Sequence, residues 1–580
     1  ELRDSYKIIP FRLEQFQKEF SLPKEFGKKE ALAYEYYTVE NHNQVVNTDD
    51  YMKLLPISKQ AIFKHNMLSE PSYNSENGTF NPLKYYKEYL RLDCLVLKKG
   101  VEKMNDTISE ITEGKMSVYE RLTISSLTDH YMIEEGAYDG VYSMQGNLRA
   151  YVASAIFGGR VCANPKYTKT LVEGKISDYD GVSLYPSAIN RLCREIGLPI
   201  GKAVRFTEET LTDWEKMTYS IVTVKITKVN KTQQMPFIAH KSEDKSIEYT
   251  NEPPDEPITV DSITLQDYIK FHEIEYEILD GVYWNNGSNK KIGAVIQRLF
   301  EARLKYKKTN VALANTIKLM LNSAYGKTMM KKSMTESLMI KAKKMRKNKK
   351  TGLWENVKKT PFMDYVYNNF NTIKSYRRVN ENIWEVERVC SDNSYNRGHI
   401  GCAILSMSKR IMNEVFDVAN SNELPIYYTD TDSIHCNLAD VPTLEVKYKE
   451  EYGKELNGKN LEQFHTDFNL DGAVSEIYAT KSIFLGKKSY IDILESTDKD
   501  GNTITGVHMR MKGITGEGLN NSAKEYSDGH FGLYKDLASG TKKKIVLNPY
   551  NPDDNSKKVM FEFKNGSVKT RKEFAREVSF

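Results

Sequence analysis

The pattern of apolar and polar positions along the chain changes several times between helix-like and strand-like spacing. Residues 82–103 carry apolar side chains at intervals of three and four, which predicts a helix. Residues 219–229 alternate and predict a strand, and residues 175–190 predict a strand that leads into a helix. Residues 294–330 and 397–420 have long amphipathic helical patterns. The chain is therefore expected to mix helices and sheet.

A hairpin with crowded charges is predicted at residues 427–435, YYTDTDSIH, where β-forming residues flank two acids. Asp430 and Asp432 are two positions apart, so strand geometry would project both to one side. Their repulsion is costly unless a cation lies between them, and oxygen-only ligands favour Mg²⁺. The alternative is a solvated turn, in which Asp and Thr are common.

Residues 177–192, SDYDGVSLYPSAINRL, repeat this arrangement. Asp180 ends the predicted strand, a tight turn follows, and a helix is expected to begin near Pro186. Asp180 could share a cation with Asp432, the turn could offer N–H groups to a phosphate, and Tyr185 could pack beside a sugar. An ordinary strand-to-helix turn with a capping Asp is the alternative.

The helical region that follows carries cations, an amide and an aromatic residue on shared faces. Arg303 and Lys307 are four positions apart, and Lys318, Asn322 and Tyr325 follow the same helical spacing. Such a face suits a triphosphate followed by a base. For any one of these residues, a solvated basic helix face is an equally simple interpretation.

Charge is distributed unevenly. The net charge of +5 arises from 83 basic and 78 acidic residues, so local clusters matter more than the total. Residues 327–360 hold twelve Lys or Arg against Glu336 and Glu355, a pattern typical of polyanion binding. A solvated basic loop is the alternative there. Residues 241–262 are acidic, contain proline and are expected to form a surface loop or insertion.

The cysteines and the hydropathy exclude several classes of protein. The six cysteines show no CxxC and no zinc-ligand spacing, which indicates a reducing compartment. No apolar run approaches 18 residues and no secretion signal is evident, so we expect an intracellular protein without a membrane partner, in a host cytoplasm or associated with an organelle or virus. The chain begins with Glu1 rather than Met, as a fragment or processed product would. The cysteines are Cys94, Cys162, Cys193, Cys390, Cys402 and Cys436.

Four segments together resemble the B-family DNA polymerases. DGVSLYPS at 180–187 is similar to motif A of that family, KLMLNSAYG at 318–326 to motif B, and YTDTDS at 428–433 to motif C. KKSY at 487–490 resembles the later KxY motif. All four occur in the order of the family, and the intact acids argue against an inactive polymerase-like scaffold that only binds DNA.

The resemblance implies an α+β right-hand polymerase with palm, fingers and thumb, and DNA synthesis from dNTPs on a template and primer. It implies two Mg²⁺ ions, which Mn²⁺ could replace, at Asp180 and Asp432, with the Gly181 carbonyl completing one site and Asp430 assisting. Lys488 and Tyr490 would contact the primer. The residues implied in nucleotide binding are Ser183, Leu184, Tyr185, Arg303, Lys307, Lys318, Asn322 and Tyr325.

Within that family the sequence is most similar to the protein-primed branch, whose members copy linear phage, viral and plasmid genomes from a terminal protein. The long spacings between motifs leave room for two insertions, near 191–300 and 331–395, of which the second would enclose downstream DNA. DSYKIIPF at 4–11 and IFGG at 156–159 resemble DNA-contacting segments of the branch, although IFGG lacks the usual Tyr. The residues implied there are Ser5, Tyr6, Phe11, Gly158 and Gly159.

The N-terminal part is expected to be the C-terminal remnant of an RNase H-like 3′–5′ exonuclease domain. YLRLD, with Tyr89 and Asp93, fits the third exonuclease motif, yet no DxE precedes residue 4, so little proofreading is expected from these residues. An RNA-primed or exonuclease-deficient B-family enzyme is therefore the alternative. The expected divisions are 1–155 for the exonuclease part, 156–190 and 396–500 for the palm, 191–300 and 331–395 for the insertions with a palm strand in the first, 301–330 for the fingers and 501–580 for the thumb.

Overall fold

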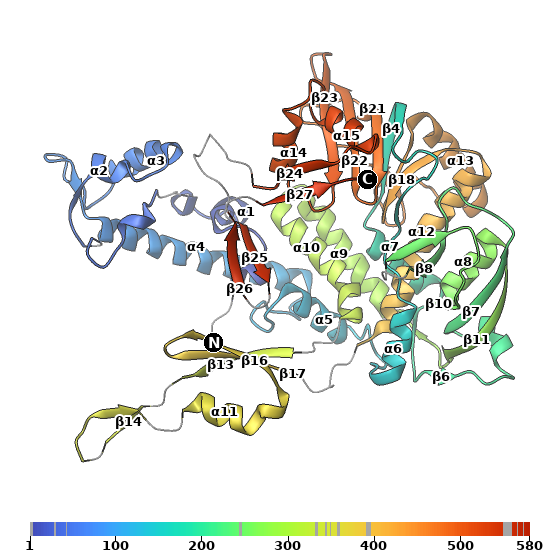
Figure 1. Ribbon diagram of the computed structural model, residues 1–580, viewed down its shortest axis with the longest axis horizontal. Coiled ribbons are helices and arrows are strands. Elements are labelled where there is room, and N and C mark those ends of the chain that lie inside the picture. Colours follow the sequence, from blue (N-terminus) through green and yellow to red (C-terminus); the bar gives the residue numbers. More distant parts are fainter. Residues whose placement is uncertain are drawn as a thin grey trace.

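The structure is a computed structural model of the chain (Figure 1). It describes residues 4–27, 31–41, 43–242, 246–330, 335–342, 345–348, 350–356, 360–389, 396–548, 560–564, 567–571 and 574–580. No helix among these residues is long and apolar enough to cross a membrane.

An antiparallel sheet forms the centre of the described chain. Its strand order is β23-β22-β21-β4-β19-β18-β3, and β20 pairs with the end of β4. The second half of β4 is almost wholly buried, and β19 and β21 pair with its two edges. The strands are β3 (Val161–Ala163), β4 (Leu171–Gly181), β18 (Ile426–Asp430), β19 (Ser433–Asn437), β20 (Phe464–Thr466), β21 (Tyr478–Gly486), β22 (Ser489–Thr497) and β23 (Thr503–Met511).

Helices α7 (Leu184–Glu195) and α12 (Gly398–Ser421) pack against each other beside this sheet. Nearly every side chain of α12 is buried, which explains its apolar pattern. A second sheet, with the order β10-β7-β11-β6, packs against α12 through α8. Its elements are β6 (Val204–Arg205), β7 (Tyr219–Val229), β10 (Ile258–Asp261), β11 (Ile274–Trp284) and α8 (Ser262–His272), with α13 (Val441–Tyr452) on the far side of α12.

The predicted strand at 219–229 is confirmed as β7, whereas the prediction of a loop over 241–262 was wrong in part. That segment contains β9 (Ile247–Thr250), which pairs with β8 (Ile238–Lys241), and also β10. Its prolines lie in the connection between β9 and β10, so the pattern marked that connection and missed the short strands on either side.

The helical pattern at 294–330 is confirmed, and it is divided between two packed helices, α9 (Lys291–Lys307) and α10 (Val311–Gly326). Asn310 starts the second helix, because its side chain accepts a hydrogen bond from the backbone N–H of Leu313 at 3.0 Å. The chain reverses there, and α10 packs between α9 and α5 (Ile124–Glu134).

The N-terminal part is mainly helical and has an aromatic core of its own, which includes Tyr51, Phe63 and Phe80. The helix predicted at 82–103 extends further, as α4 (Pro82–Ile111). Within the described residues up to 155, the named strands are the short pair β1–β2, and a large RNase H-like sheet is not among them. The other elements are α1 (Phe16–Glu19), α2 (Thr48–Met52), α3 (Ile57–Met67), α6 (Gly146–Ser154), β1 (Val46–Asn47) and β2 (Thr79–Phe80).

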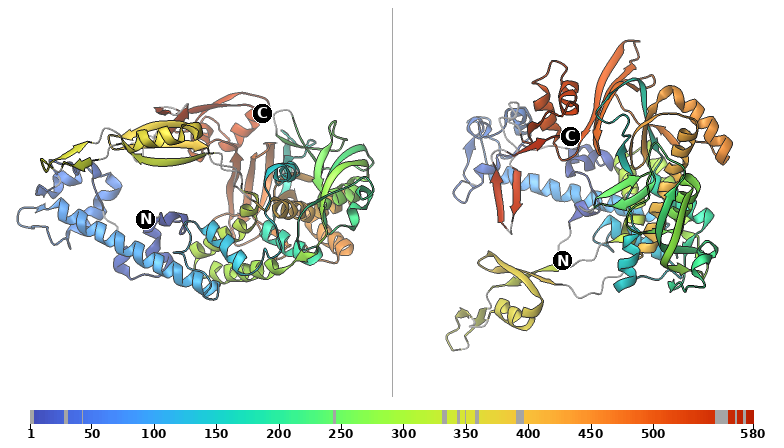
Figure 2. Two further views of the ribbon diagram at one scale, coloured as in Figure 1. Left: turned by 90° about the horizontal axis from the view of Figure 1, so that it is seen from below. Right: turned by 45° about the vertical axis from the view of Figure 1, so that its right-hand side comes forward.

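Residues 335–389 form a projecting module that extends away from the central sheet in all three views (Figures 1 and 2). Phe362 stacks on Trp384 with ring centroids 4.2 Å apart, and Tyr376 packs on both rings. Its elements are β13 (Thr335–Lys341), β14 (Met345–Lys347), β15 (Trp354–Asn356), α11 (Pro361–Asn369), β16 (Ile373–Asn380) and β17 (Ile383–Val389). Much of the basic run lies outside the described residues, namely Lys331, Lys332, Lys343, Lys344, Lys349, Lys358 and Lys359.

The C-terminal part packs beside β21 and β22 around a second apolar core that includes Phe531, Leu533 and Tyr534. Its elements are α14 (Gly516–Ala523), α15 (His530–Ala538), β24 (Lys543–Val546), β25 (Met560–Lys564), β26 (Ser567–Arg571) and β27 (Ala575–Val578).

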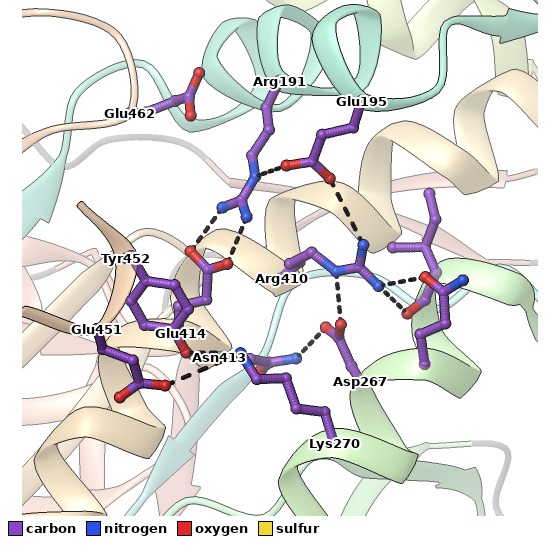
Figure 3. A network of polar contacts seen from close by, with 12 residues as sticks. Arg191, Glu195, Asp267, Lys270, Arg410, Asn413, Glu414, Glu451, Tyr452 and Glu462 are labelled. Carbon is purple, nitrogen blue, oxygen red and sulfur yellow. Dashed lines mark hydrogen bonds and ion pairs between the residues drawn. The ribbon is translucent and has the colours of Figure 1, made fainter. Parts of the chain in front are cut away.

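A buried ionic network fixes α7 to the helices beneath it (Figure 3). The guanidinium of Arg191 donates to both carboxylate oxygens of Glu414 on α12 and to Glu195 one turn along α7. Arg410 on α12 bonds Asp267 on α8 at 2.6 Å and lies 3.7 Å from Glu195. Removing one partner of such a buried pair costs about 3–5 kcal/mol of stability, so the network holds the helix that follows β4 in one place.

Candidate active site

The acids at 430–432 lie at a tight hairpin turn. Strand β18 ends at Asp430 and β19 begins at Ser433, and Thr431 has a left-handed backbone with φ of 70°. The expectation that Asp430 and Asp432 project to one side of a continuous strand was wrong. The turn interrupts the two-residue alternation, so Asp432 lies at the tip of the hairpin.

Asp180 is brought next to this turn by strand pairing. It lies opposite Ser433 in the β4–β19 register, and the backbone N–H of Gly181 donates to the carbonyl of Asp432 at 2.7 Å. Residues that are 252 positions apart in the chain thus lie on adjacent strands. The end of β4 and the tip of the hairpin together form an acidic site.

The ionised forms of Asp180 and Asp432 are unfavourable at this site unless a cation binds. Burial, and after it the negative charge of Asp432, raises the pKa of Asp180 to about 9. Burial, together with the negative charge of Asp430, raises the pKa of Asp432 to about 6. The positive charge of Lys318 on α10 lowers the pKa of both carboxyl groups and so partly offsets this effect. The donor atoms are carboxylate oxygens, which suits a hard divalent cation.

Asp430 has a cation partner of its own. The Lys488 ammonium lies 2.7 and 2.9 Å from the two carboxylate oxygens of Asp430, and the Lys488 N–H donates to the Tyr428 hydroxyl. Among the described residues, Asp180, Asp430 and Asp432 do not offer three ligand atoms within 4.8 Å of one another. The structure therefore pairs Asp430 with Lys488, whereas Asp180 and Asp432 have no ion pair of this kind among the described residues.

Tyr490, predicted at the primer, is only 6 % exposed. Its ring packs on Tyr428 at 4.8 Å and on His435 at 5.2 Å, so most of the side chain supports the hairpin from below. Its role at the primer stays a prediction.

The predicted nucleotide-binding residues gather around the turn between β4 and α7. Ser183 has a left-handed backbone, and its hydroxyl accepts a hydrogen bond from Arg303 of α9 at 2.6 Å. Tyr185 stacks on Tyr325 of α10 with ring centroids 4.0 Å apart. One residue from each of two helices, α9 and α10, thus contacts this turn, although both helices are distant from it in the sequence.

The other predicted residues lie on the same elements. Leu184 is buried at the start of α7, Lys307 is exposed at the end of α9, and Asn322 is half-buried on α10. Lys318 lies one turn before Asn322, as the helical spacing predicts. The roles of these residues in binding a nucleotide stay predictions.

The IFGG segment packs on the acidic hairpin. A side chain at Gly159 would meet that of Thr431 at 2.6 Å, and the backbone N–H of Thr431 donates to the carbonyl of Arg160. Gly158 is exposed, and its carbonyl accepts a hydrogen bond from Tyr249. Close packing explains the second glycine, whereas a DNA contact stays a prediction for both.

The predicted N-terminal contacts are mixed. Tyr6 is 60 % exposed and Ser5 is half-buried, whereas Phe11 packs on Phe16 and Phe20. Tyr89 and Asp93 are one turn apart on α4, where burial and the Asp93 carboxylate raise the pKa of Tyr89. Their exonuclease assignment is untested by this arrangement.

Sequence reasoning missed a buried polar cluster directly behind the acids. It contains Asp178 on β4, His435 on β19, Asp492 on β22 and His508 on β23. The sequence signal is weak, since Asp178 precedes Asp180 by two positions and His435 closes the hairpin motif. The partner Asp492 is 57 residues from His435, and local spacing does not indicate such a contact.

The chain matches the sequence profile of the family described as "DNA polymerase type B, organellar and viral" over residues 1–420. Among solved structures, the DNA polymerase of phage phi29 in a ternary complex with primer-template DNA and incoming nucleotides aligns with a TM-score of 0.56 at 15% identity, covering 99% of this chain and 79% of that one. An orthorhombic crystal form of the same polymerase gives 0.55 at 16%, with 98% and 79% covered. No curated protein matches the chain.

The fold is that of a right-hand, family B polymerase, of mixed helix and sheet. The chain belongs to the type B DNA polymerases of organellar and viral origin, enzymes that synthesise DNA and use divalent metal ions.

Metal binding at Asp180 and Asp432 is expected to release protons. A raised carboxyl pKa means that the folded chain holds the proton more tightly than the unfolded chain, so without metal this contribution to stability is lost as the pH rises toward about 9. Mg²⁺ should displace about one proton at pH 7 and raise the melting temperature more at pH 8 than at pH 6. Titration calorimetry in two buffers of different ionisation enthalpy measures the release.

Asp180→Asn should remove most of the proton release, while Asp440→Asn, at a half-buried acid in the short helix that follows the hairpin, should leave it unchanged. A binding enthalpy that is the same in both buffers would contradict the assignment.

Proposed function

We propose that this chain is a protein-primed replicative polymerase that adds deoxynucleotides with two Mg²⁺ ions held at Asp180 and Asp432. The observation that carries the assignment of the centre is the pairing of β4 with β19. It sets two partly buried carboxylates, each with a raised pKa, beside the stacked rings of Tyr185 and Tyr325. The turn proposed to bind the nucleotide and the acidic site thus lie next to each other.

Mg²⁺ would be held by the carboxylates of Asp180 and Asp432 and by the carbonyl of Gly181, and the donor set fits because it consists of oxygen atoms only. Bound there, the two ions supply Lewis acidity to the primer hydroxyl and to the leaving pyrophosphate. The chain contributes the fixed separation of the acids, through the hydrogen bond from Gly181 to Asp432. Lys488 keeps Asp430 neutralised until the primer arrives.

The triphosphate would lie against Arg303, Lys307 and Lys318. Arg303 is half-buried, and burial lowers its pKa, so a phosphate oxygen would regain for its guanidinium a partner of opposite charge. The bond from Arg303 to Ser183 aims this cation at the turn after Asp180. Tyr185 would lie beneath the sugar, and Asn322 and Tyr325 would line the base-pair pocket.

Protein priming is supported by the likeness to the phi29 enzyme and by the projecting module at 335–389. The module joins residues between motifs B and C, where the protein-primed branch carries an insertion. We assign 191–300 and 331–395 as the two insertions, 156–190 and 396–500 as palm, 301–330 as fingers, 501–580 as thumb and 1–155 as exonuclease remnant. The proposal includes Mg²⁺ as the metal ion and a terminal protein as a partner. It also includes a location in a host cytoplasm or in association with an organelle or virus.

Asp180→Asn and Asp432→Asn should each reduce nucleotide addition by at least about 1000-fold, because losing a carboxylate that holds the ions removes several kcal/mol of transition-state stabilisation. Binding of primer-template DNA should change little. Single-turnover extension and fluorescence anisotropy measure the two effects, with Asp440→Asn as the control that keeps normal rates. Extension at the normal rate by either variant would rule out this pair as the catalytic acids.

Tyr185→Val should admit ribonucleotides, since the ring is expected to exclude a 2′-hydroxyl by its bulk. The preference for dNTP over NTP should fall by at least about tenfold, the range in which a pocket discriminates one small group. Tyr185→Phe keeps the ring and should keep the preference. If competing dNTP and NTP incorporation is the same in Tyr185→Val as in the normal enzyme, the ring is only a packing residue.

Priming is tested with a linear template whose end matches that of the native replicon, a protein from that replicon as the candidate primer, and one labelled dNTP. A label bound covalently to the protein, and absent with Asp180→Asn, supports protein priming. Extension of DNA or RNA oligonucleotides without any protein-linked product would instead support an RNA-primed or exonuclease-deficient enzyme.

A further inference from the structure

A row of four buried or partly buried ionisable groups lies behind the catalytic acids. It connects β4 and β19 to β22 and β23, a connection that the sequence motifs do not indicate. Asp492 on β22 accepts from the Ser482 hydroxyl on β21 at 2.6 Å. The same carboxylate lies 3.3 Å from His435 Nε2 and 3.2 Å from His508 Nδ1. On the other side of its ring, His435 Nδ1 lies 3.5 Å from Asp178 Oδ1.

His435 occupies the centre of this row. Its side chain is wholly buried, and the rings of Tyr428, Phe468, Phe484 and Tyr490 surround it at centroid distances of 5.2 to 5.9 Å. Nε2 of the ring is hydrogen-bonded to Asp492, whereas Nδ1 lies 3.5 Å from the Asp178 carboxylate without a hydrogen bond. Both carboxylates lie within ion-pair distance of the ring, so a protonated His435 has a negative partner on each side, the closer one being Asp492.

The charges of the row are balanced without a metal ion. Burial alone would lower the pKa of His435, but Asp178 and Asp492 outweigh it and raise that pKa to about 9. Burial would raise the pKa of Asp492, but His435 and His508 lower it to about 2. The charged groups around His435 are Asp178 on β4, Asp430 on β18, Asp492 on β22 and, through Asp492, His508 on β23.

This bridge joins the strands of the active site. Asp178 shares a face of β4 with Asp180, and His435 follows Asp432 along β19. Asp492 is four residues beyond Lys488, which binds Asp430. We propose that His435 is a positioning residue of the polymerase centre. It fixes the β21–β22 hairpin, which carries Lys488 and Tyr490, against β4, which carries Asp180, and against the β18–β19 hairpin, which carries Asp432.

The inference rests on the proposed function, because it takes Asp180 and Asp432 as the catalytic pair. Loss of the bridge would let the hairpin shift against the acids, and a misplacement of about 1 Å can cost about 100-fold in rate. His435→Gln should therefore lower kcat for nucleotide addition by about 10- to 100-fold, with the Kd for primer-template DNA within about twofold of normal. The rates come from rapid-quench extension of a primed template with Mg²⁺.

His399→Gln is the matched control. His399 is also wholly buried, but it stacks on Trp284 and, within the described chain, has no hydrogen-bond partner for either ring nitrogen. Burial lowers its pKa to about 3. This variant should lose stability through packing and keep a normal kcat. Equal losses of kcat in His399→Gln and His435→Gln would overturn the proposal, since both effects would then be general.

A double-mutant cycle separates a bridge from a packing role. Asp492→Asn combined with His435→Gln should be no slower than the slower single variant, because either change alone breaks the same contact. Effects on kcat that multiply would overturn the proposal. If the normal enzyme itself fails to extend a primer, the proposed function fails; if it extends and His435→Gln has a normal kcat, only this inference fails.

Histidine-selective ¹⁵N NMR of the normal protein tests the bridge even if His435→Gln does not fold. At pH 7.5 one buried imidazole should carry protons on both nitrogens, with slow exchange, and that signal should disappear in Asp492→Asn. The absence of such a signal would overturn the proposal. So would a stoichiometric metal ion that the purified protein retains and His435→Gln lacks, because the row would then be a coordination site.

Discussion

The crowding of carboxylates at the end of β4 is the constraint on which the rest of the structure depends. Asp180 and Asp432 are held close by a backbone hydrogen bond, and burial denies them the water that would screen their repulsion. Cations approach from two sides, Lys318 from α10 and Lys488 from the β21–β22 connection. The site is therefore stable enough to fold yet retains an uncompensated negative charge, which is the condition for binding a divalent cation.

The scaffold around the acids is rigid because its layers are tied together away from the site. The network of Arg191, Glu414 and Arg410 holds α7 on α12 and α8 (Figure 3). As α7 begins three residues after Gly181, this network also fixes the turn that carries Tyr185. Buried ion pairs contribute little net stability. They favour one arrangement of helices, because any other arrangement would leave buried charges unpaired.

The helices α9 and α10 both contact the turn between β4 and α7, where a nucleotide is proposed to bind. Arg303 reaches Ser183 from α9, and Tyr325 stacks on Tyr185 from α10. Each helix shares the main apolar core with α7 and also reaches the strand-to-helix turn through one of these side-chain contacts. Contacts of this kind are modest in free energy and can be exchanged for contacts with a nucleotide.

The sequence by itself determined which chemistry the chain carries. The motif spacings and the helical periodicities are local, so they predicted β7, α12, the acidic hairpin, and the faces of Lys318, Asn322 and Tyr325. The membership of the type B polymerases, which the motifs suggested, is confirmed. What only the tertiary structure decided are long-range contacts: the packing of Gly159 and Arg160 on Thr431, the ion pair of Asp430 with Lys488, and the contact of His435 with Asp492. These depend on how separate strands pack, and no local pattern records the partner that a buried charge will meet.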